Sequence, residues 1–187
     1  MIISFNGNHG SGKSTISKMV AEKLSFKRYD GGSFFRNTAK QNKMTLKELS
    51  ALRLKDPKWD NEIDNYIKNL GETEDNFVAD GRMVWHFIPH SLKIYLKVNE
   101  LEAAKRIYAE LQKDKTRNIE EGAMDSLESI IDKQKKRKEE DIVIYGKYYG
   151  VDIHDPKNYD LVLDTTGLSI QEVFKKIMEF IESRKNK

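Results

Sequence analysis

Short apolar runs alternate with longer amphipathic segments along the chain. The short runs predict five β-strands, over residues 2–6, 26–30, 76–80, 92–98 and 159–164. The segments between them repeat apolar residues at helical spacing, as Ile16, Met19, Val20 and Leu24 do in the helix expected over 13–24. This alternation is typical of βαβ units. We therefore predict an α/β fold with a five-stranded parallel sheet flanked by helices.

Cap signals set the expected limits of several helices. Thr45 and Glu48 form a capping-box pattern at the start of a helix that runs to about residue 54. Asp56-Pro57 marks the start of the next helix, which Gly71 is expected to end. Ser169 and Glu172 cap the last helix. Its apolar residues are expected to face the sheet: Ile170, Val173, Phe174, Ile177 and Ile181.

Two connections are long enough to be helical insertions, at about 33–72 and 105–150. The remainder, about 1–32, 73–104 and 151–187, forms the expected core of a single domain. Ligands of open parallel sheets bind beyond the carboxyl ends of the strands. Both insertions leave from those ends, so we expect them to close over a ligand there.

Composition narrows the possible functions. The net charge is +3, from 33 basic and 30 acidic side chains among 187 residues, which is too weak to indicate nucleic-acid binding. The absence of cysteine excludes disulfides, thiolate metal sites and cysteine catalysis. No apolar run approaches the ~20 residues of a membrane span, and no basic leader precedes the first strand. We expect a cytoplasmic monomer with no membrane or nucleic-acid partner.

A phosphate-binding motif follows the first strand. Residues 7–14 read Gly7-Asn8-His9-Gly10-Ser11-Gly12-Lys13-Ser14, with Thr15 next, and a helix begins at once. Strand, glycine-rich loop and helix together identify a P-loop, because its backbone N–H groups and the helix N-terminus cradle phosphates. Lys13 is expected to reach the β- and γ-phosphates of ATP. His9 could touch phosphate, or it could be a variable loop position.

A carboxylate and a hydroxyl are the candidate Mg²⁺ ligands. Ser14 is placed to bind the metal, and Asp80 ends the third strand, where P-loop enzymes need a carboxylate near it. The alternative is that Asp80 is a surface turn residue. The Gly81-Arg82 that follows favours the metal role.

In phosphoryl transfer the donor and acceptor phosphates repel each other, and arginines offset this repulsion by pairing with their oxygens. Arg36 and Arg82 both lie just past strand ends, and Arg137 lies in the second insertion. Arg106 and Arg117 are further candidates there. Taken alone, Arg137 would belong to a solvated helix face.

The chain resembles the nucleoside monophosphate kinases, and most closely the short archaeal-type cytidylate kinases. The resemblance covers nearly the whole chain and rests on these stretches: GNHGSGKST, DGGSFFRNTAK, DPKWDNEID, VADGRMVW and YGVDIHDPKNYDLVLDTTGLSIQEV. It implies a P-loop core with an acceptor-binding insertion and a lid, and phosphoryl transfer from ATP to CMP or dCMP with Mg²⁺. It also implies that Arg36 and Arg82 contact the acceptor.

The lid departs from the pattern of these kinases. They carry an arginine, an acidic residue four positions on and a second arginine three beyond; here the residues are Arg137, Asp141 and Ile144. The second arginine is missing. Lys138, Lys147 or Arg106 could substitute for it.

The acceptor base is expected to meet the first insertion. Asp60 and Asp64 are spaced i, i+4 and share a helix face, and a carboxylate suits the amino group of cytosine. The alternative is a solvated acidic face. Ser33 is a further, weaker candidate for acceptor contact.

Three other functions stay open. The acceptor could be another nucleoside monophosphate or a small hydroxyl compound. Ile144 would suit a nucleotide-binding regulator with weak transferase activity. The basic run over 133–138 could bind nucleic acid, although the acidic residues around it favour a solvated lid helix.

Overall fold

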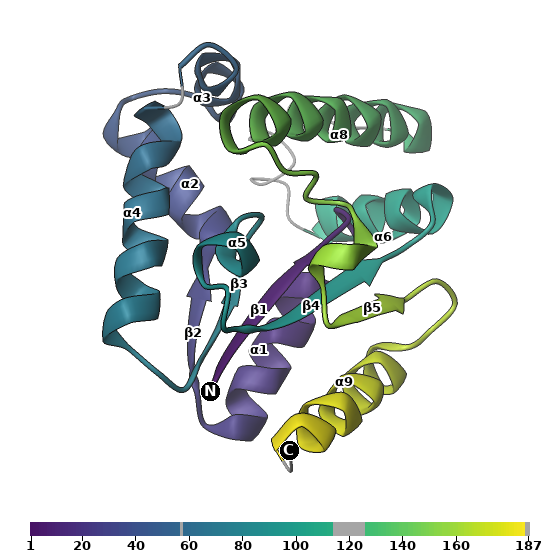
Figure 1. Cartoon of the computed structure of the whole chain (residues 1–187). Helices are drawn as coiled ribbons and strands as arrows, with labels where there is room; N and C mark the ends of the chain where they lie inside the picture. The colour runs from purple at the N-terminus through teal and green to yellow at the C-terminus, as the bar shows by residue number, and fades with distance from the viewer. Residues whose placement is uncertain (57, 114–125, 186–187) are drawn as a thin grey trace.

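The computed structural model describes residues 1–56, 58–113 and 126–185 (Figure 1). Two expectations fall outside this range. Pro57 was expected at the start of a helix, and Arg117 was a candidate lid arginine.

Five parallel strands form one sheet in the order β2-β3-β1-β4-β5. They are β1 (Ile2–Gly7), β2 (Lys27–Asp30), β3 (Phe77–Asp80), β4 (Leu92–Lys97) and β5 (Leu161–Asp164). The central strand β1 lies between β3 and β4, with Ile3 opposite Val78 on one side and Leu92 on the other. The predicted five-stranded parallel sheet is confirmed.

Helices follow or separate the strands, and the sequence did not predict the short one over residues 84–87. They are α1 (Lys13–Leu24), α2 (Gly31–Gln41), α3 (Leu46–Arg53), α4 (Lys58–Thr73), α5 (Val84–Phe87), α6 (Glu100–Lys113), α8 (Leu127–Tyr149) and α9 (Ile170–Lys185), with a short 3-10 turn η1 (Pro156–Asn158). The capping box of Thr45 and Glu48 is present at the start of α3. The proposed boundary between residues 104 and 105 falls inside α6.

Side chains of alternate residues of β1 pack into two hydrophobic clusters, one on each face of the sheet. Ile3 and Phe5 are fully buried on the face that α1 and α9 cover. Ile2 points to the opposite face, which α4 and α5 cover. Because both faces are covered, β1 and β3 are buried along their whole length, whereas the edge strand β2 reads KRYD and is only partly buried.

Helix α8 lies across the carboxyl edge of the sheet (Figure 1). At its start Ile130 packs against Ile107 and Leu111 of α6. Near its end Ile144 and Tyr145 pack with residues that follow β3, among them Trp85. This helix therefore spans the region where the strands end.

Two local expectations were wrong. Gly71 does not end its helix, because α4 continues to Thr73. It lies instead where α4 passes close to α5, since a Cβ there would stand 2.8 Å from Cγ1 of the buried Ile88. Ile170 is 53% exposed rather than packed on the sheet, because it is the first residue of α9, before the buried stripe begins.

None of the helices described combines the length and apolar character needed to cross a membrane.

Two glycine-to-alanine substitutions should change stability in opposite directions. Gly71→Ala should lower the free energy of unfolding by about 1–2 kcal/mol, because overpacking against Ile88 exceeds the gain in helix propensity. Gly146→Ala is the matched control, since Gly146 lies inside α8 and a Cβ added there would meet no heavy atom within 4 Å. It should raise the free energy by about 0.5–1 kcal/mol. Urea denaturation of both variants measures the difference, and a stabilised Gly71→Ala protein would contradict the close approach.

Candidate active site

The loop between β1 and α1 has the shape of an anion cradle. A Cβ at Gly7 would stand 2.1 Å from the carbonyl oxygen of Leu96 on β4, so only glycine fits there. Gly12, at the start of α1, has a φ of 86°, which also favours glycine. The N–H of Asn8 donates to the same Leu96 carbonyl at 3.0 Å. The loop is thereby fixed in front of the N-terminus of α1, where unpaired N–H groups and the helix dipole attract anions.

Lys13 is surrounded by charges from other segments. Its Nζ donates to the carbonyl of Asn8 at 3.4 Å. Burial and the positive charge of Arg82 lower the pKa of Lys13 to about 8, although Asp80 and Asp141 act in the opposite direction. Lys13 therefore loses its proton more easily than an ordinary lysine does. A negatively charged ligand beside it would stabilise the protonated form. Ser14 and Thr15, next along the first turn of α1, are exposed.

Asp80 lies buried at the end of β3 in a hydrogen-bonded cluster. Its Oδ2 accepts from the Ser17 hydroxyl at 2.8 Å and from the guanidinium of Arg28. Arg28 also donates to Ser17 Oγ at 3.0 Å. Burial and the nearby Asp30 raise the pKa of Asp80, whereas Arg28 lowers it. Sequence reasoning missed Arg28 and Ser17, although Ser17 lies one turn beyond Ser14 on the same helix.

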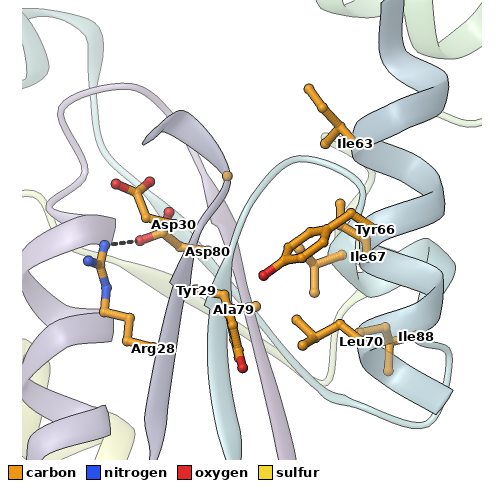
Figure 2. A pocket seen from close by; sticks show the side chains of 12 residues that line it. Arg28, Tyr29, Asp30, Ile63, Tyr66, Ile67, Leu70, Ala79, Asp80 and Ile88 are labelled. Atoms are coloured by element: carbon orange, nitrogen blue, oxygen red, sulfur yellow. Dashed lines mark hydrogen bonds and ion pairs between the residues drawn. The ribbon is translucent and has the colours of Figure 1, made fainter. Parts of the chain in front are cut away.

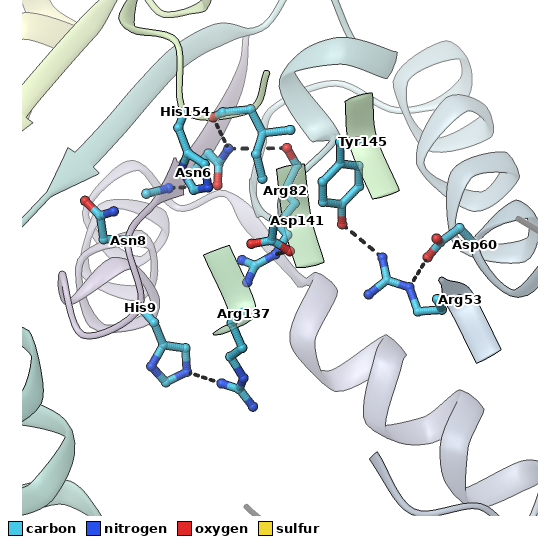
Figure 3. A network of polar contacts seen from close by, with 12 residues as sticks. Asn6, Asn8, His9, Arg53, Asp60, Arg82, Arg137, Asp141, Tyr145 and His154 are labelled. Carbon is cyan, nitrogen blue, oxygen red and sulfur yellow. Dashed lines mark hydrogen bonds and ion pairs between the residues drawn. The ribbon is translucent and has the colours of Figure 1, made fainter. Parts of the chain in front are cut away.

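Arg82, just past β3, is fixed at both its backbone and its side chain. Its carbonyl accepts hydrogen bonds from Asn6 at 3.3 Å and from the indole of Trp85 at 2.9 Å. Its Nε donates to Asp141 Oδ1 of α8 at 2.8 Å (Figure 3). A guanidinium has five N–H groups, so the Asp141 contact orients Arg82 without using all its donors.

A second contact joins α8 to the P-loop. Arg137 Nη1 lies 2.9 Å from His9 Nε2 (Figure 3). Because a guanidinium can only donate, His9 accepts on this nitrogen. The structure therefore places both residues beside the anion cradle. His9 links this loop to α8.

The first insertion contains a buried ion pair that also contacts α8. Arg53, the last residue of α3, donates from Nε to Asp60 Oδ1 at 2.6 Å. Its Nη2 also donates to the hydroxyl of Tyr145 at 3.0 Å (Figure 3). Asp60 is 4% exposed, so it does not belong to a solvated acidic face. Sequence reasoning missed Arg53, because nothing in its own segment distinguishes it from a surface residue at a helix end.

Asp64 is buried beside the end of α8. Its Oδ2 accepts a hydrogen bond from the Tyr149 hydroxyl. Burial raises the pKa of Asp64 to about 6, and the charge of Asp60 acts in the same direction, while Tyr149 opposes the shift. Asp60 is thus linked to α8 through Arg53 and Tyr145, and Asp64 directly through Tyr149.

Two of the remaining predicted residues lie at the start of α2. Arg36 is half exposed, and its Nη2 is 3.5 Å from Asp30 Oδ2 at the end of β2. Ser33 belongs to the first turn of α2, but its side chain is outside the described part of the structure.

The proposed substitutes for the missing lid arginine lie in different surroundings. Ile144 itself is buried in the apolar cluster with Trp85 and does not face the charged groups. Arg106 is held by Glu102 and by Thr165, to whose carbonyl it donates at 2.8 Å. Lys138 and Lys147 are exposed on α8.

A cavity of about 210 Å³ opens between α4 and the edge of the sheet formed by β2 and β3 (Figure 2). Apolar side chains such as Ile63, Ile67 and Leu70 line its helix side. Its other end reaches Asp30 and Asp80 at the carboxyl edge of the sheet. The space is therefore continuous with the region where the predicted acceptor-binding residues begin.

No three His, Asp or Glu side chains gather into a self-sufficient metal site within residues 1–56, 58–113 and 126–185. A hydroxyl and one carboxylate near an anion cradle still suit Mg²⁺, which commonly takes one or two protein ligands and completes its shell with phosphate and water.

The sequence matches the Cytidylate kinase-like family over residues 2–167. It is 32% identical to a cytidylate kinase of Methanosarcina acetivorans over 88% of this chain and 87% of that protein. It is also 32% identical to an S-adenosylmethionine-dependent nucleotide dehydratase of Lacinutrix mariniflava, over 95% of this chain but only 35% of that longer protein.

Solved structures show the same fold at lower identity. A shikimate kinase from Bacteroides thetaiotaomicron superimposes with a TM-score of 0.64 at 17% identity, over 97% of this chain and 98% of that one. At this identity the likeness supports the α/β fold and not the substrate.

The raised pKa of Asp64 predicts a specific pH dependence of stability. The native protein holds a proton on Asp64 up to about pH 6, whereas the unfolded chain loses it near pH 4. The native state therefore binds more protons between these values, and the free energy of unfolding should fall as the pH rises through this window. Asp64→Asn should remove this part of the slope, measured by urea denaturation from pH 4 to 7.

Asp132→Asn, at a position on α8 away from this contact, is the control and should keep the parent slope. An Asp64→Asn protein with the same slope as the parent would show that Asp64 titrates normally.

Proposed function

The chain belongs to the cytidylate kinase-like family, and on that premise we propose that it transfers the γ-phosphoryl group of ATP to a nucleoside monophosphate, with CMP or dCMP preferred. One observation carries the proposal. At a single edge of the sheet, an anion cradle with a partly buried lysine lies beside arginines contributed by two other segments, Arg82 and Arg137. A phosphate donor and a phosphate acceptor require such an arrangement, because each needs its own cationic partners.

The P-loop holds the donor. Backbone N–H groups of residues 8–15 surround the β-phosphate, and Lys13 reaches toward the γ-phosphate. His9 adds a ring nitrogen at the mouth of the loop. Since the first turn of α1 is exposed, phosphates reach it without rearrangement of the core.

Ser14 and Asp80 would hold Mg²⁺, which when bound neutralises charge on the β- and γ-phosphates. Asp80 is already oriented by Arg28 and Ser17, so its carboxylate is fixed in place. That cluster keeps it at the edge of the sheet where the cradle lies.

Arg36 and Arg82 hold the acceptor phosphate in line with the donor. Asp141 fixes Arg82 through Nε, which leaves its terminal N–H groups to pair with phosphate oxygens. Arg137, on the helix that forms the lid, lies over the transferring group. The acceptor is already an anionic phosphate, so positioning and charge stabilisation are sufficient and no strong general base is required.

The first insertion, about residues 33–72, binds the nucleoside. Asp60 or Asp64 accepts a hydrogen bond from the amino group of cytosine, and Ser33 contributes at the start of α2. The burial of both aspartates supports this role, because a desolvated carboxylate discriminates strongly between a donor and an acceptor on a base.

A second candidate function is a nucleotide-binding regulator with weak transferase activity. The burial of Ile144 among apolar side chains favours it, because this position offers no charge to the acceptor. Loss of one such contact lowers rates by a factor of about 10² to 10³.

ADP release measured with CMP, dCMP, UMP, AMP and GMP tests the proposal. We expect the cytosine nucleotides to give the highest kcat/KM. Lys13→Met should lower it by at least about 10²-fold, because it removes the charge on the phosphates. Lys18→Met, on the exposed side of the same helix, is the control and should leave the rate unchanged. Equally slow turnover of all five acceptors would contradict the cytidylate assignment, and tight ATP binding with no acceptor-dependent turnover would favour the regulator.

The lowered pKa of Lys13 predicts weaker ATP binding at alkaline pH. In the free protein Lys13 loses its proton above about pH 8, and bound phosphates restore it. Affinity should therefore fall by about tenfold per pH unit above pH 8, with proton uptake on binding. Calorimetry at pH 7 to 9.5 in two buffers of different ionisation enthalpy measures both effects. Lys13→Met should bind ATP more weakly and with no such pH dependence.

A further inference from the structure

Arg28 occupies one oxygen of the carboxylate at the end of β3. Its guanidinium donates to Asp80 Oδ2, and the hydroxyl of Ser17 donates to the same atom at 2.8 Å. A carboxylate oxygen has two lone-pair sites, so these two bonds complete Oδ2. Among the residues that the structure describes, no hydrogen bond reaches Asp80 Oδ1. A ligand from outside the chain therefore finds one available oxygen on this carboxylate and not two.

The planar guanidinium also fixes the rotation of the carboxylate. Arg28 donates from Nε to Ser17 Oγ at 3.0 Å while its Nη2 holds Asp80, so a single group bridges α1 and β3. Ser17 is fully buried, and the side chain of Asp80 is 6% exposed. Charge-assisted bonds from such a fork are strong and directional. Asp80 therefore cannot turn both oxygens toward the cradle without breaking this contact.

The direction of the Arg28 side chain follows from the alternation along β2. Lys27 and Tyr29 both reach Glu74, just beyond α4, at 2.7 and 2.9 Å. Successive side chains of a strand point to opposite faces, so Arg28 is directed toward α1. Opposite it in the strand register is Val78, a member of the apolar cluster on that face. An arginine at the border of an apolar cluster loses hydration, so its presence is better explained by the carboxylate it holds than by packing.

A second carboxylate lies beside Asp80. Asp30 is opposite Asp80 in the register of β2 and β3, and Figure 2 shows both carboxylates at the same edge, with Arg28 bonded to Asp80. Asp30 Oδ1 accepts from the N–H of Gly32 at 2.9 Å. Without the guanidinium, two neighbouring carboxylates would repel each other and would together offer several oxygens to one cation. Arg28 prevents this edge from acting as a chelate of many oxygens.

We propose that Arg28 is a positioning residue that makes the site select Mg²⁺ over Ca²⁺. The proposal rests on the function proposed above, in which Ser14 and Asp80 would hold the metal, and it adds the choice of metal. Mg²⁺ needs few protein ligands and keeps water in its octahedral shell, so one carboxylate oxygen suits it. Ca²⁺ takes about six to eight oxygens and often binds both oxygens of a carboxylate. Because Oδ2 is occupied, Asp80 does not supply such a bidentate contact.

Arg28→Met tests this role, because it frees Oδ2 and lets the carboxylate turn. We expect the affinity of the protein for a non-hydrolysable ATP analogue with Mg²⁺ to fall by about 10- to 100-fold, as loss of an outer contact to a metal ligand commonly does. Affinity with Ca²⁺ should fall far less or should rise. The ratio of the two affinities should therefore fall by about tenfold or more. Calorimetric titration of the analogue at saturating Mg²⁺ and at saturating Ca²⁺ measures this ratio.

Two further variants separate the orientation of the carboxylate from its charge. Arg28→Lys keeps a cation beside Asp80 but loses the planar fork, so it should lower the ratio by a smaller factor. Lys27→Met is the matched control. It removes one positive charge at the adjacent position of the same strand, but on the opposite face, where Nζ of Lys27 bonds to Glu74. This control should keep the parent ratio.

Thermal melting without metal or nucleotide shows whether each variant is folded. If Arg28→Met fails to fold, Arg28→Lys decides by the same ratio, because its buried carboxylate keeps a cationic partner. An unchanged ratio in the folded Arg28 variants, or a parent that binds the analogue equally well with both metals, would overturn the selection of Mg²⁺ alone. No turnover of any nucleoside monophosphate by the parent would instead overturn the proposed function.

Discussion

The partial burial of Lys13 among charges of both signs is the constraint on which the site depends. A parallel sheet brings the ends of its strands to one edge, so the P-loop after β1 and the residues after β2 and β3 must meet there. Lys13 loses hydration in this position and is opposed by Arg82, while Asp80 and Asp141 sustain its charge. A bound polyphosphate relieves the imbalance, which is why the arrangement favours an anionic ligand.

The sequence predicted those features that are determined by interactions between residues close together in the chain. The P-loop, the capping box at Thr45 and the parallel strands follow from spacing within short windows. Gly71 was misread as a helix end, because its role depends on Ile88, a residue of another element. The sequence does not reveal such a close approach, and a glycine at the end of an apolar stripe looks the same in either case.

The partners of the predicted site residues were beyond prediction for the same reason. Asp80 was identified from its place at a strand end, but Arg28 lies 52 positions away. Asp60 and Asp64 stood out by their helical spacing, yet Tyr145 and Tyr149 reach the first insertion from 85 or more positions further along the chain. The family resemblance pointed to the aspartates, and only the folded chain shows that they are buried and which of them retains an unsatisfied oxygen.

The spacing of polar residues along α8 explains how one helix serves several parts of the site. Arg137, Asp141, Tyr145 and Tyr149 are four positions apart and form a stripe that turns slowly around the helix. In order they contact the P-loop, Arg82 just past β3, the end of α3 and the middle of α4. Ile144 is outside this stripe and packs into the apolar cluster below, so an arginine there would meet Trp85 rather than a phosphate. Any movement of α8 must therefore change its contacts with the P-loop and with the first insertion together, because all four contacts are made by one rigid helix.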